Sequence, residues 1–148
     1  MNLNEKINLD LKTSMKSGDK LRTETIRSIR ALILEFQKSG TGKELNAEEE
    51  VKLLTGAAKK RKDSIEQYRN AGREDLAGKE EKELEIIQEY LPEQLNKEKI
   101  KMEVDRIAKQ IGAVSKADFP KLMPAVMKEL KGKADGKEVR SVVEEYLG

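Results

Sequence analysis

Residues 83–100 read ELEIIQEYLPEQLNKEKI, and this stretch carries the features that decide the fold. Before Pro92, apolar residues recur at the three- and four-residue spacing of one helix face. Pro92 ends that helix, because the residue before a proline is pushed out of helical geometry, and Asn96 can cap the next helix. We therefore expect a domain boundary here, between an N-terminal domain at 1–92 and a C-terminal domain at 93–148.

The helical spacing of apolar residues continues outward in both directions, and no stretch shows the alternation of a strand. Glycines and capping residues separate the periodic segments. The sequence therefore predicts an all-α protein, with an N-terminal helical bundle of about four helices followed by a three-helix C-terminal domain. The expected helices lie at about 4–17, 19–39, 46–72 and 73–90, and at 96–111, 115–131 and 135–147.

The sixth expected helix contains two prolines. If Asp118 is its cap, Pro120 lies in the first turn, where an amide would have no helical acceptor. Pro124 removes a hydrogen bond from the helix interior, so we expect a kink or a late start.

Composition excludes most familiar catalytic sites. The chain has 148 residues, of which 58 are charged, and it contains no Cys and no His. Thiolate nucleophiles, Ser-His-Asp triads, imidazole ligands and structural zinc sites are therefore absent from the sequence. No apolar run approaches the roughly 18 residues of a membrane span. We expect a cytoplasmic protein with no catalytic residues, cofactor or metal, and no membrane association.

Residues 39–44, SGTGKE, have some likeness to a phosphate-binding loop. That motif needs a further glycine where Gln37 stands and a Ser or Thr where Glu44 stands, and no strand precedes the stretch. We interpret it as a flexible loop.

The densest positive feature is a row of cations along the third expected helix. At about 100° per residue, four of them share a sector of roughly 100° beside the apolar stripe, over about 25 Å. Such a row suits contacts with phosphates, but acidic residues of the fourth helix could equally hold it in ion pairs. We call it the basic rail: Lys52, Lys59, Lys62 and Arg69, with Arg73 just after.

Two arginines project with the apolar stripes instead of beside them. Arg22 lies alongside Ile29, and Arg61 lies among apolar residues of the third helix. A buried guanidinium must be paired, so each forms an ion pair with a neighbouring helix or faces a cleft between helices. Glu80 or Glu83 is a candidate partner of Arg61.

A second basic element is the loop KGKADGK at 131–137, followed by Arg140. Its glycines allow close backbone approach, and the N-terminus of the seventh helix could bind an anion. Asp135 can cap the same amides, and we favour capping. The candidate cations here are Lys131, Lys133, Lys137 and Arg140.

Three stretches together resemble the GatB/YqeY family: KKRKDSIEQYRNAGREDL at 59–76, EYLPEQL at 89–95 and GKADGKEV at 132–139. They occur in order, and the resemblance covers nearly the whole chain. Two positions depart from the usual pattern, because Lys133 stands where Arg is usual and Pro120 where Gly is common.

The resemblance implies kinship with the tail of the B subunit of the aspartyl/glutamyl-tRNA amidotransferase. That module engages tRNA, while amide formation resides in other domains and subunits. The family description of a carbon–nitrogen ligase with glutamine as amide donor thus applies by similarity only. The expected function is a tRNA-binding accessory of aminoacyl-tRNA metabolism, whose partners are tRNA and a tRNA-modifying or aminoacylating enzyme. The alternative is a helical protein-interaction module without an RNA role.

Any RNA recognition is expected to follow shape and backbone. Readers of single strands usually stack bases on exposed aromatic rings. All five aromatic residues occupy positions on apolar stripes, where we expect the core to take them: Phe36, Tyr68, Tyr90, Phe119 and Tyr146.

Overall fold

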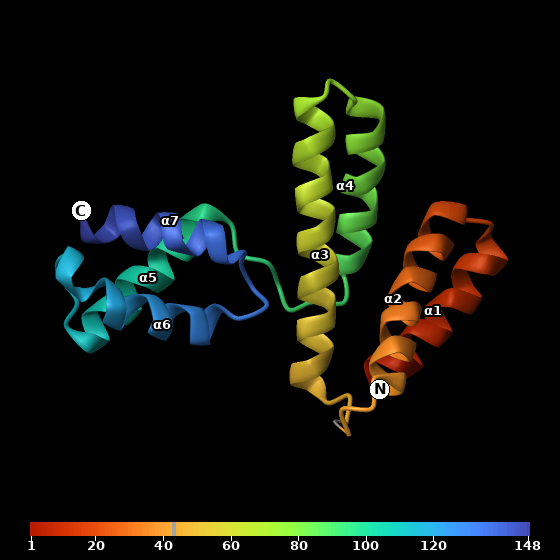
Figure 1. Cartoon of the computed structure of the whole chain (residues 1–148), viewed down its shortest axis with the longest axis horizontal. Coiled ribbons are helices and arrows are strands. Elements are labelled where there is room, and N and C mark those ends of the chain that lie inside the picture. Colours follow the sequence, from red (N-terminus) through yellow and green to blue (C-terminus); the bar gives the residue numbers. More distant parts are fainter. Residues whose placement is uncertain (43) are drawn as a thin grey trace. The chain divides into compact units, whose positions relative to one another are not determined.

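The computed structural model describes residues 1–42 and 44–148, so Lys43 in the SGTGKE stretch lies outside the described residues. The described chain is built of helices and contains no strand (Figure 1). This confirms the all-α fold class. The α-helices are α1 (Leu3–Ser17), α2 (Lys20–Lys38), α3 (Ala47–Asn70), α4 (Glu74–Gln88), α5 (Lys97–Ile111), α6 (Phe119–Leu130) and α7 (Gly136–Leu147).

The chain divides into two compact units, Met1–Leu91 and Pro92–Gly148. Each unit has its own apolar core. The core of the first unit includes Ile7, Ile26, Ile29, Leu54 and Ile87. The core of the second includes Ile100, Val104, Leu122, Val126 and Val143.

In the first unit, α1 packs beside α2, and α3 packs beside α4. Gly18 ends α1 in the left-handed conformation, at φ 74°, which costs a glycine little. The side chain of Asp19 then caps α2 by accepting a hydrogen bond from the Arg22 N–H. The helical spacing of α1 also favours Met15 as a core residue, but Met15 is 54% exposed.

The buried position near the end of α1 belongs to Ser14. The Thr23 hydroxyl donates to Ser14 Oγ at 2.9 Å, and Ser14 Oγ donates to the Leu11 carbonyl at 3.0 Å. A hydroxyl that has both a hydrogen-bond donor and an acceptor as partners can be buried at little cost. The hairpin therefore buries Ser14 and leaves Met15 exposed.

The second unit begins α6 late, at Phe119, after a 3₁₀ turn over Lys116–Asp118. The Asp118 carboxylate does not cap α6. It accepts hydrogen bonds from the amides of Val114 and Ser115, at 2.8 and 3.1 Å, which lowers the pKa of Asp118. Pro124 lies inside α6, yet the helix continues to Leu130.

The segment after Pro92 is held on the loop before α7. Gln94 Nε2 donates to the Pro92 carbonyl at 2.8 Å and to the Gly132 carbonyl at 2.7 Å. The Leu95 N–H donates to the Lys133 carbonyl at 2.8 Å. Two of the stretches that carry the family resemblance therefore meet, through a side chain and an amide of one stretch and two backbone carbonyls of the other.

Replacing Gln94 by Leu should lower the stability of the second unit by about 1–3 kcal/mol, because it leaves the carbonyl of the buried Gly132 without this donor. Urea unfolding followed by the NMR signals of the Val104 and Val143 methyl groups reports on this unit alone. Gln110→Leu, at an exposed position of α5, is the matched control and should change stability by less than about 0.5 kcal/mol. Equal effects of the two substitutions would contradict the structural role of Gln94.

Candidate nucleic-acid interface

The two ends of the basic rail lie in ion pairs. Lys52 Nζ is 3.5 Å from a carboxylate oxygen of Glu49, one turn earlier on α3. At the other end, Arg69 pairs with Glu81 of α4 and lies 3.4 Å from Glu74. These pairs neutralise much of the charge that the rail would present to a phosphate.

Arg73 is also paired, although it lies beyond the rail. It immediately precedes α4, and its guanidinium is 3.1 Å from the Asp75 carboxylate. The hydrogen bond from Arg73 is the main reason that the pKa of Asp75 is lowered. Both groups are exposed, so the contact adds little to stability.

The middle of the rail is different. Lys59 is exposed and Lys62 half-buried, and within the described residues neither has a carboxylate partner. Of the five cations of this element, these two keep an uncompensated charge.

Arg61 points away from the rail and joins three helices of the first unit. Its Nε lies 3.2 Å from Glu83 and 3.6 Å from Glu80, both on α4. One of its Nη atoms is 3.3 Å from Ser28 Oγ on α2. The side chain is only 16% exposed, so it is a structural cation that connects α2, α3 and α4.

Glu80 is the least satisfied member of this cluster. Its Oε2 is buried and accepts no hydrogen bond within the described residues. Burial, and then the like charge of Glu83, raise the pKa of Glu80 above its ordinary value of 4.5. Arg61 acts in the opposite direction, so the cluster holds two carboxylates against one guanidinium.

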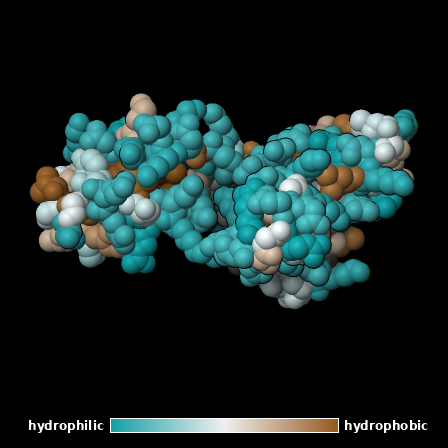
Figure 2. Space-filling view, turned by 90° about the horizontal axis from the view of Figure 1, so that it is seen from above, coloured by the Kyte–Doolittle hydropathy of each residue, from teal (hydrophilic) through white to brown (hydrophobic). Residues whose placement is uncertain are grey.

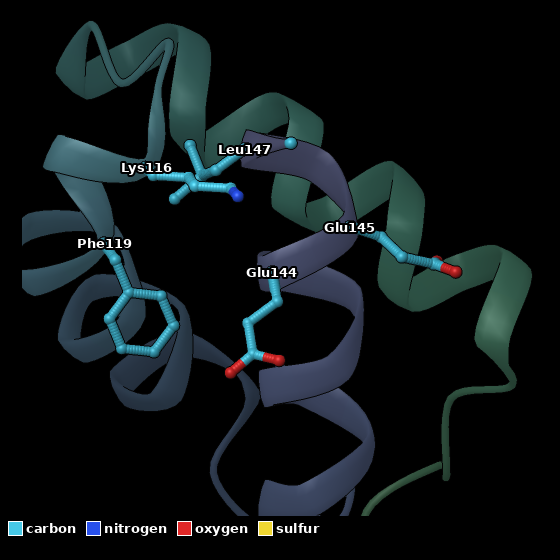
Figure 3. Close-up of a pocket in the computed structure, with 6 residues that line it drawn as sticks. Lys116, Phe119, Glu144, Glu145 and Leu147 are labelled. Carbon is cyan, nitrogen blue, oxygen red and sulfur yellow. The ribbon is translucent and has the colours of Figure 1, made fainter.

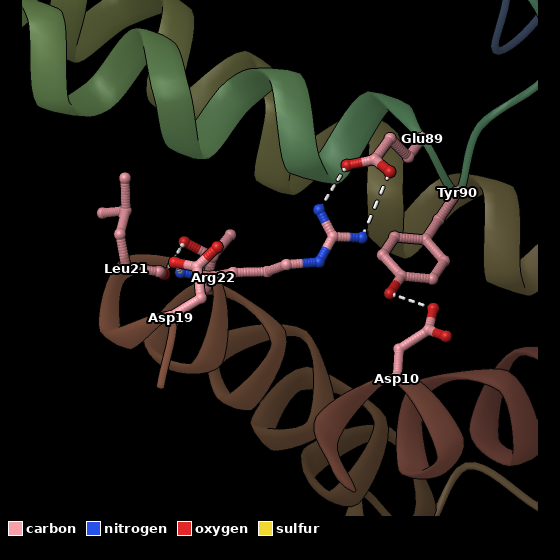
Figure 4. A network of polar contacts seen from close by, with 7 residues as sticks. Asp10, Asp19, Leu21, Arg22, Glu89 and Tyr90 are labelled. Carbon is pink, nitrogen blue, oxygen red and sulfur yellow. Dashed lines mark hydrogen bonds and ion pairs between the residues drawn. The ribbon is translucent and has the colours of Figure 1, made fainter. Parts of the chain in front are cut away.

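Arg22 likewise forms an ion pair that joins helices of the first unit (Figure 4). Its two Nη atoms donate to the two carboxylate oxygens of Glu89, at 2.8 and 3.1 Å, which ties α2 to the end of α4. Next to this pair, the Tyr90 hydroxyl donates to Asp10 of α1 at 2.5 Å. Burial is the main cause that raises the pKa of Tyr90. These contacts give Arg22 a structural role, so Arg22 does not face an open cleft between helices.

In the second unit, Lys131 and Lys133 lie exposed in the loop before α7, and Lys137 lies exposed in the first turn of α7. Asp135 caps α7 by accepting a hydrogen bond from the Lys137 N–H at 3.2 Å. Capping therefore uses an amide that an anion would need.

Arg140 of the same unit is paired. Its Nε donates to Glu144 at 2.9 Å, and its guanidinium lies 5.7 Å from the centre of the Phe119 ring. Lys133 and Lys137 have no carboxylate partner within the described residues.

An open groove of about 570 Å³ lies beside Phe119 (Figure 3). Phe119 and Leu147 form its apolar part, and Lys116, Glu144 and Glu145 line it as well. It offers no cluster of ligands for a metal, and no such cluster of His, Cys, Asp or Glu occurs elsewhere among residues 1–42 and 44–148.

The expectation for the aromatic residues is wrong for Tyr146. Its side chain is 38% exposed, and its hydroxyl donates to Asp105 of α5 at 3.0 Å. The other four aromatic residues are half-buried.

Most of the face shown in Figure 2 is hydrophilic, and apolar residues appear there in small separate areas. In the part of the chain that the structure describes, no helix has the length and apolar character needed to cross a bilayer.

Comparison with known proteins gives a match to one family over almost the whole chain. Residues 4–147 match the family described as "Yqey-like protein". "Altered inheritance of mitochondria protein 41, mitochondrial" of Pyrenophora tritici-repentis is 32% identical over 148 residues, which cover 97% of this chain and 80% of that protein. The protein of the same name from Lachancea thermotolerans is 39% identical over 82 residues, or 55% of this chain and 44% of the relative. An uncharacterized protein of Schizosaccharomyces pombe is 38% identical over 93 residues, or 62% of this chain and 74% of the relative.

These relatives correct one expectation. Two of them carry the word mitochondrial in their names, whereas the sequence led us to expect a cytoplasmic protein. The expectation of a cytoplasmic location is therefore wrong. It rested on composition and on the absence of an apolar segment, and neither property distinguishes one aqueous compartment from another.

Replacing Arg61 by Met should lower the stability of the first unit by about 3 kcal/mol, because it strands two mostly buried carboxylates. Urea unfolding measures the loss. The triple variant Arg61→Met/Glu80→Gln/Glu83→Gln should recover most of it, since no buried charge then remains. Arg27→Met is the matched control, because Arg27 is exposed and has no ion pair within the described residues. A control that destabilises as much as Arg61→Met would contradict the account.

Glu80 should also make stability depend on pH. Because its pKa is raised in the folded protein, the folded state holds this proton more tightly than the unfolded chain does. The resulting contribution is present below pH 4.5 and is lost as pH rises through the folded pKa. Glu80→Gln should therefore gain stability relative to the wild type between about pH 4 and pH 7. Glu85→Gln, exposed on the same helix, serves as the control. Parallel pH profiles for wild type and Glu80→Gln would refute the prediction.

Proposed function

The chain is a member of the YqeY-like family, and on this premise we propose that it binds tRNA as an accessory protein of aminoacyl-tRNA metabolism. The resemblance to the tail of the tRNA amidotransferase B subunit motivates the choice of ligand. The partner enzyme in this proposal is one that modifies or aminoacylates tRNA. The protein itself supplies binding and no catalysis, because the chain has no Cys or His to serve as nucleophile or general base.

One observation supports this proposal most strongly: of the nine cations that the sequence singled out for nucleic-acid binding, four stay without carboxylate partners in the described part of the chain. Within the described residues, these are Lys59 and Lys62 on α3, Lys133 before α7 and Lys137 in the first turn of α7. A lysine that is not neutralised by its own protein can neutralise a phosphate and release a counterion. Lys52, Arg69, Arg73 and Arg140 are held by carboxylates and contribute less.

The mode of recognition that fits this surface is contact with the folded RNA backbone. Phosphate contacts position a protein on RNA without reading its sequence. Tyr146 is the only exposed aromatic residue within the described part of the chain, and its hydroxyl is engaged by Asp105. One exposed ring does not make the row of stacking platforms on which single-strand binders rely.

A second candidate function is a protein-interaction module, and the groove beside Phe119 favours it. An apolar floor with charged side chains at its edge is the kind of groove that accepts an apolar side chain of a partner helix. Such binding would depend much less on salt than phosphate recognition does.

A fluorescence-anisotropy titration with bulk tRNA at about 50 and 200 mM salt tests the proposal. We expect binding that weakens steeply with salt and exceeds the binding of a single-stranded homopolymer. Lys59→Gln/Lys62→Gln should reduce the slope of log affinity against log salt by about 1.8, which corresponds to two contacts. Lys79→Gln/Lys82→Gln, at two exposed positions of α4, removes the same charge and should have a smaller effect.

No binding to tRNA at the lower salt concentration would refute the tRNA-binding function. Equal or tighter binding to the homopolymer would refute recognition by folded shape. Binding that is insensitive to salt would favour the protein-interaction module.

A further inference from the structure

The arginines of the chain fall into two groups. Of the eight arginines, six pair with a carboxylate: Arg22, Arg61, Arg69, Arg73, Arg106 and Arg140. Within the described residues, Arg27 and Arg30 have no such partner, and both are exposed. They lie three residues apart on α2, outside the basic rail.

Arg27 and Arg30 share one face of α2 with Lys20. At about 100° per residue, positions 20, 27 and 30 lie within a sector of roughly 80°, and they extend over about 15 Å of helix. Lys20 is exposed and also lacks a carboxylate partner within the described part of the chain. We call these three residues the α2 cation face.

A groove of about 420 Å³ adjoins this face where α2 meets the end of α1. Lys20, Arg27, Met15 and Glu24 are among the residues that line it. Glu24 is the one acid in the lining, and it forms no ion pair with either cation. The groove thus has a net positive lining.

The backbone under the groove is held in place. The Thr23 hydroxyl lies 2.9 Å from Ser14 Oγ and 2.8 Å from the Asp19 carbonyl oxygen, so the two helices of the hairpin are joined at this point. The Asp19 carboxylate is engaged by the Arg22 N–H at 3.1 Å, as the cap of α2. The Asp19 carboxylate is therefore occupied with capping, and the cations project from a hairpin whose two helices are joined by hydrogen bonds.

We propose that the α2 cation face is a phosphate-binding surface for the sugar-phosphate backbone of folded RNA. The inference rests on the proposed tRNA-binding function and names the side chains that make its contacts. Arginine suits this role because its planar guanidinium donates two parallel hydrogen bonds to one phosphate. Six arginines direct those hydrogen bonds to carboxylates of the protein itself, whereas within the described residues Arg27 and Arg30 do not.

A membrane surface is the other source of phosphate groups, and the face fits it less well. Helices that lie in a membrane interface bury a continuous apolar stripe among the acyl chains. Here the exposed apolar side chains near the cations are Met15 and Leu34, which come from different helices and form no stripe. The α2 cation face is therefore suited to a ligand that remains in water.

The test compares two triple variants that remove the same charge. Lys20→Gln/Arg27→Gln/Arg30→Gln alters the α2 cation face, and Lys97→Gln/Lys101→Gln/Lys128→Gln alters three exposed lysines of the second unit. Both should melt as the wild type does, because none of the six side chains has an ion pair within the described residues. Each protein is titrated with bulk tRNA over a range of salt and, separately, with vesicles that contain anionic phospholipid.

We expect the α2 variant to bind tRNA at least about tenfold more weakly, with a salt slope smaller by about 2.7, or three contacts, and the control to lose much less. Wild-type binding with equal losses in the two variants would overturn the inference and leave the tRNA-binding function intact. Loss of vesicle binding with tRNA binding unchanged would also overturn it and assign the face to a membrane. Failure of the wild type to bind tRNA would refute the function and the inference together.

Discussion

The first unit depends on the fact that a guanidinium removed from water must have a carboxylate beside it. Arg61 is the mostly buried cation of the bundle, and it reaches Glu80 and Glu83 on α4 and Ser28 on α2. The cluster therefore joins α2, α3 and α4 through a single side chain. Arg22 applies the same constraint at the other end of α4, through Glu89.

The same requirement separates the cations of the surface into those that have a carboxylate partner and those that do not. Each cation that meets a carboxylate of its own protein is occupied, and so Lys52, Arg69 and Arg73 are engaged by carboxylates of α3 and α4 although they looked available in the sequence. The cations without partners then become the natural candidates for phosphate contacts. Among them we single out Lys59 and Lys62 in the middle of α3, Lys133 before α7, Lys137 in the first turn of α7, and the α2 cation face.

Much of the fold could be predicted from the sequence, because glycine stops, caps and helical periodicity are local signals. Gly18 and Gly112 end helices as expected, and Glu80 and Glu83 were candidate partners of Arg61 before the structure placed them there. The failures have a common cause, which is tertiary context. Met15 lies on the apolar spacing of α1, but the hydroxyl pair of Ser14 and Thr23 takes the inner position. The α2 cation face could not be found in the sequence, since spacing does not show which arginines lack a carboxylate.

We propose that the unpaired cations of the α2 cation face and of the middle of α3 bind phosphate, whereas arginines already paired with carboxylates contribute little to that binding. Two double variants with the same change in charge test it most directly: Arg27→Gln/Arg30→Gln, which removes unpaired arginines, and Arg69→Gln/Arg73→Gln, which removes paired ones. The measurement is tRNA affinity as a function of salt. The account predicts that the first variant loses affinity and about 1.8 of the salt slope, while the second stays close to the wild type. Equal losses in both variants, or a larger loss in the second, would contradict it.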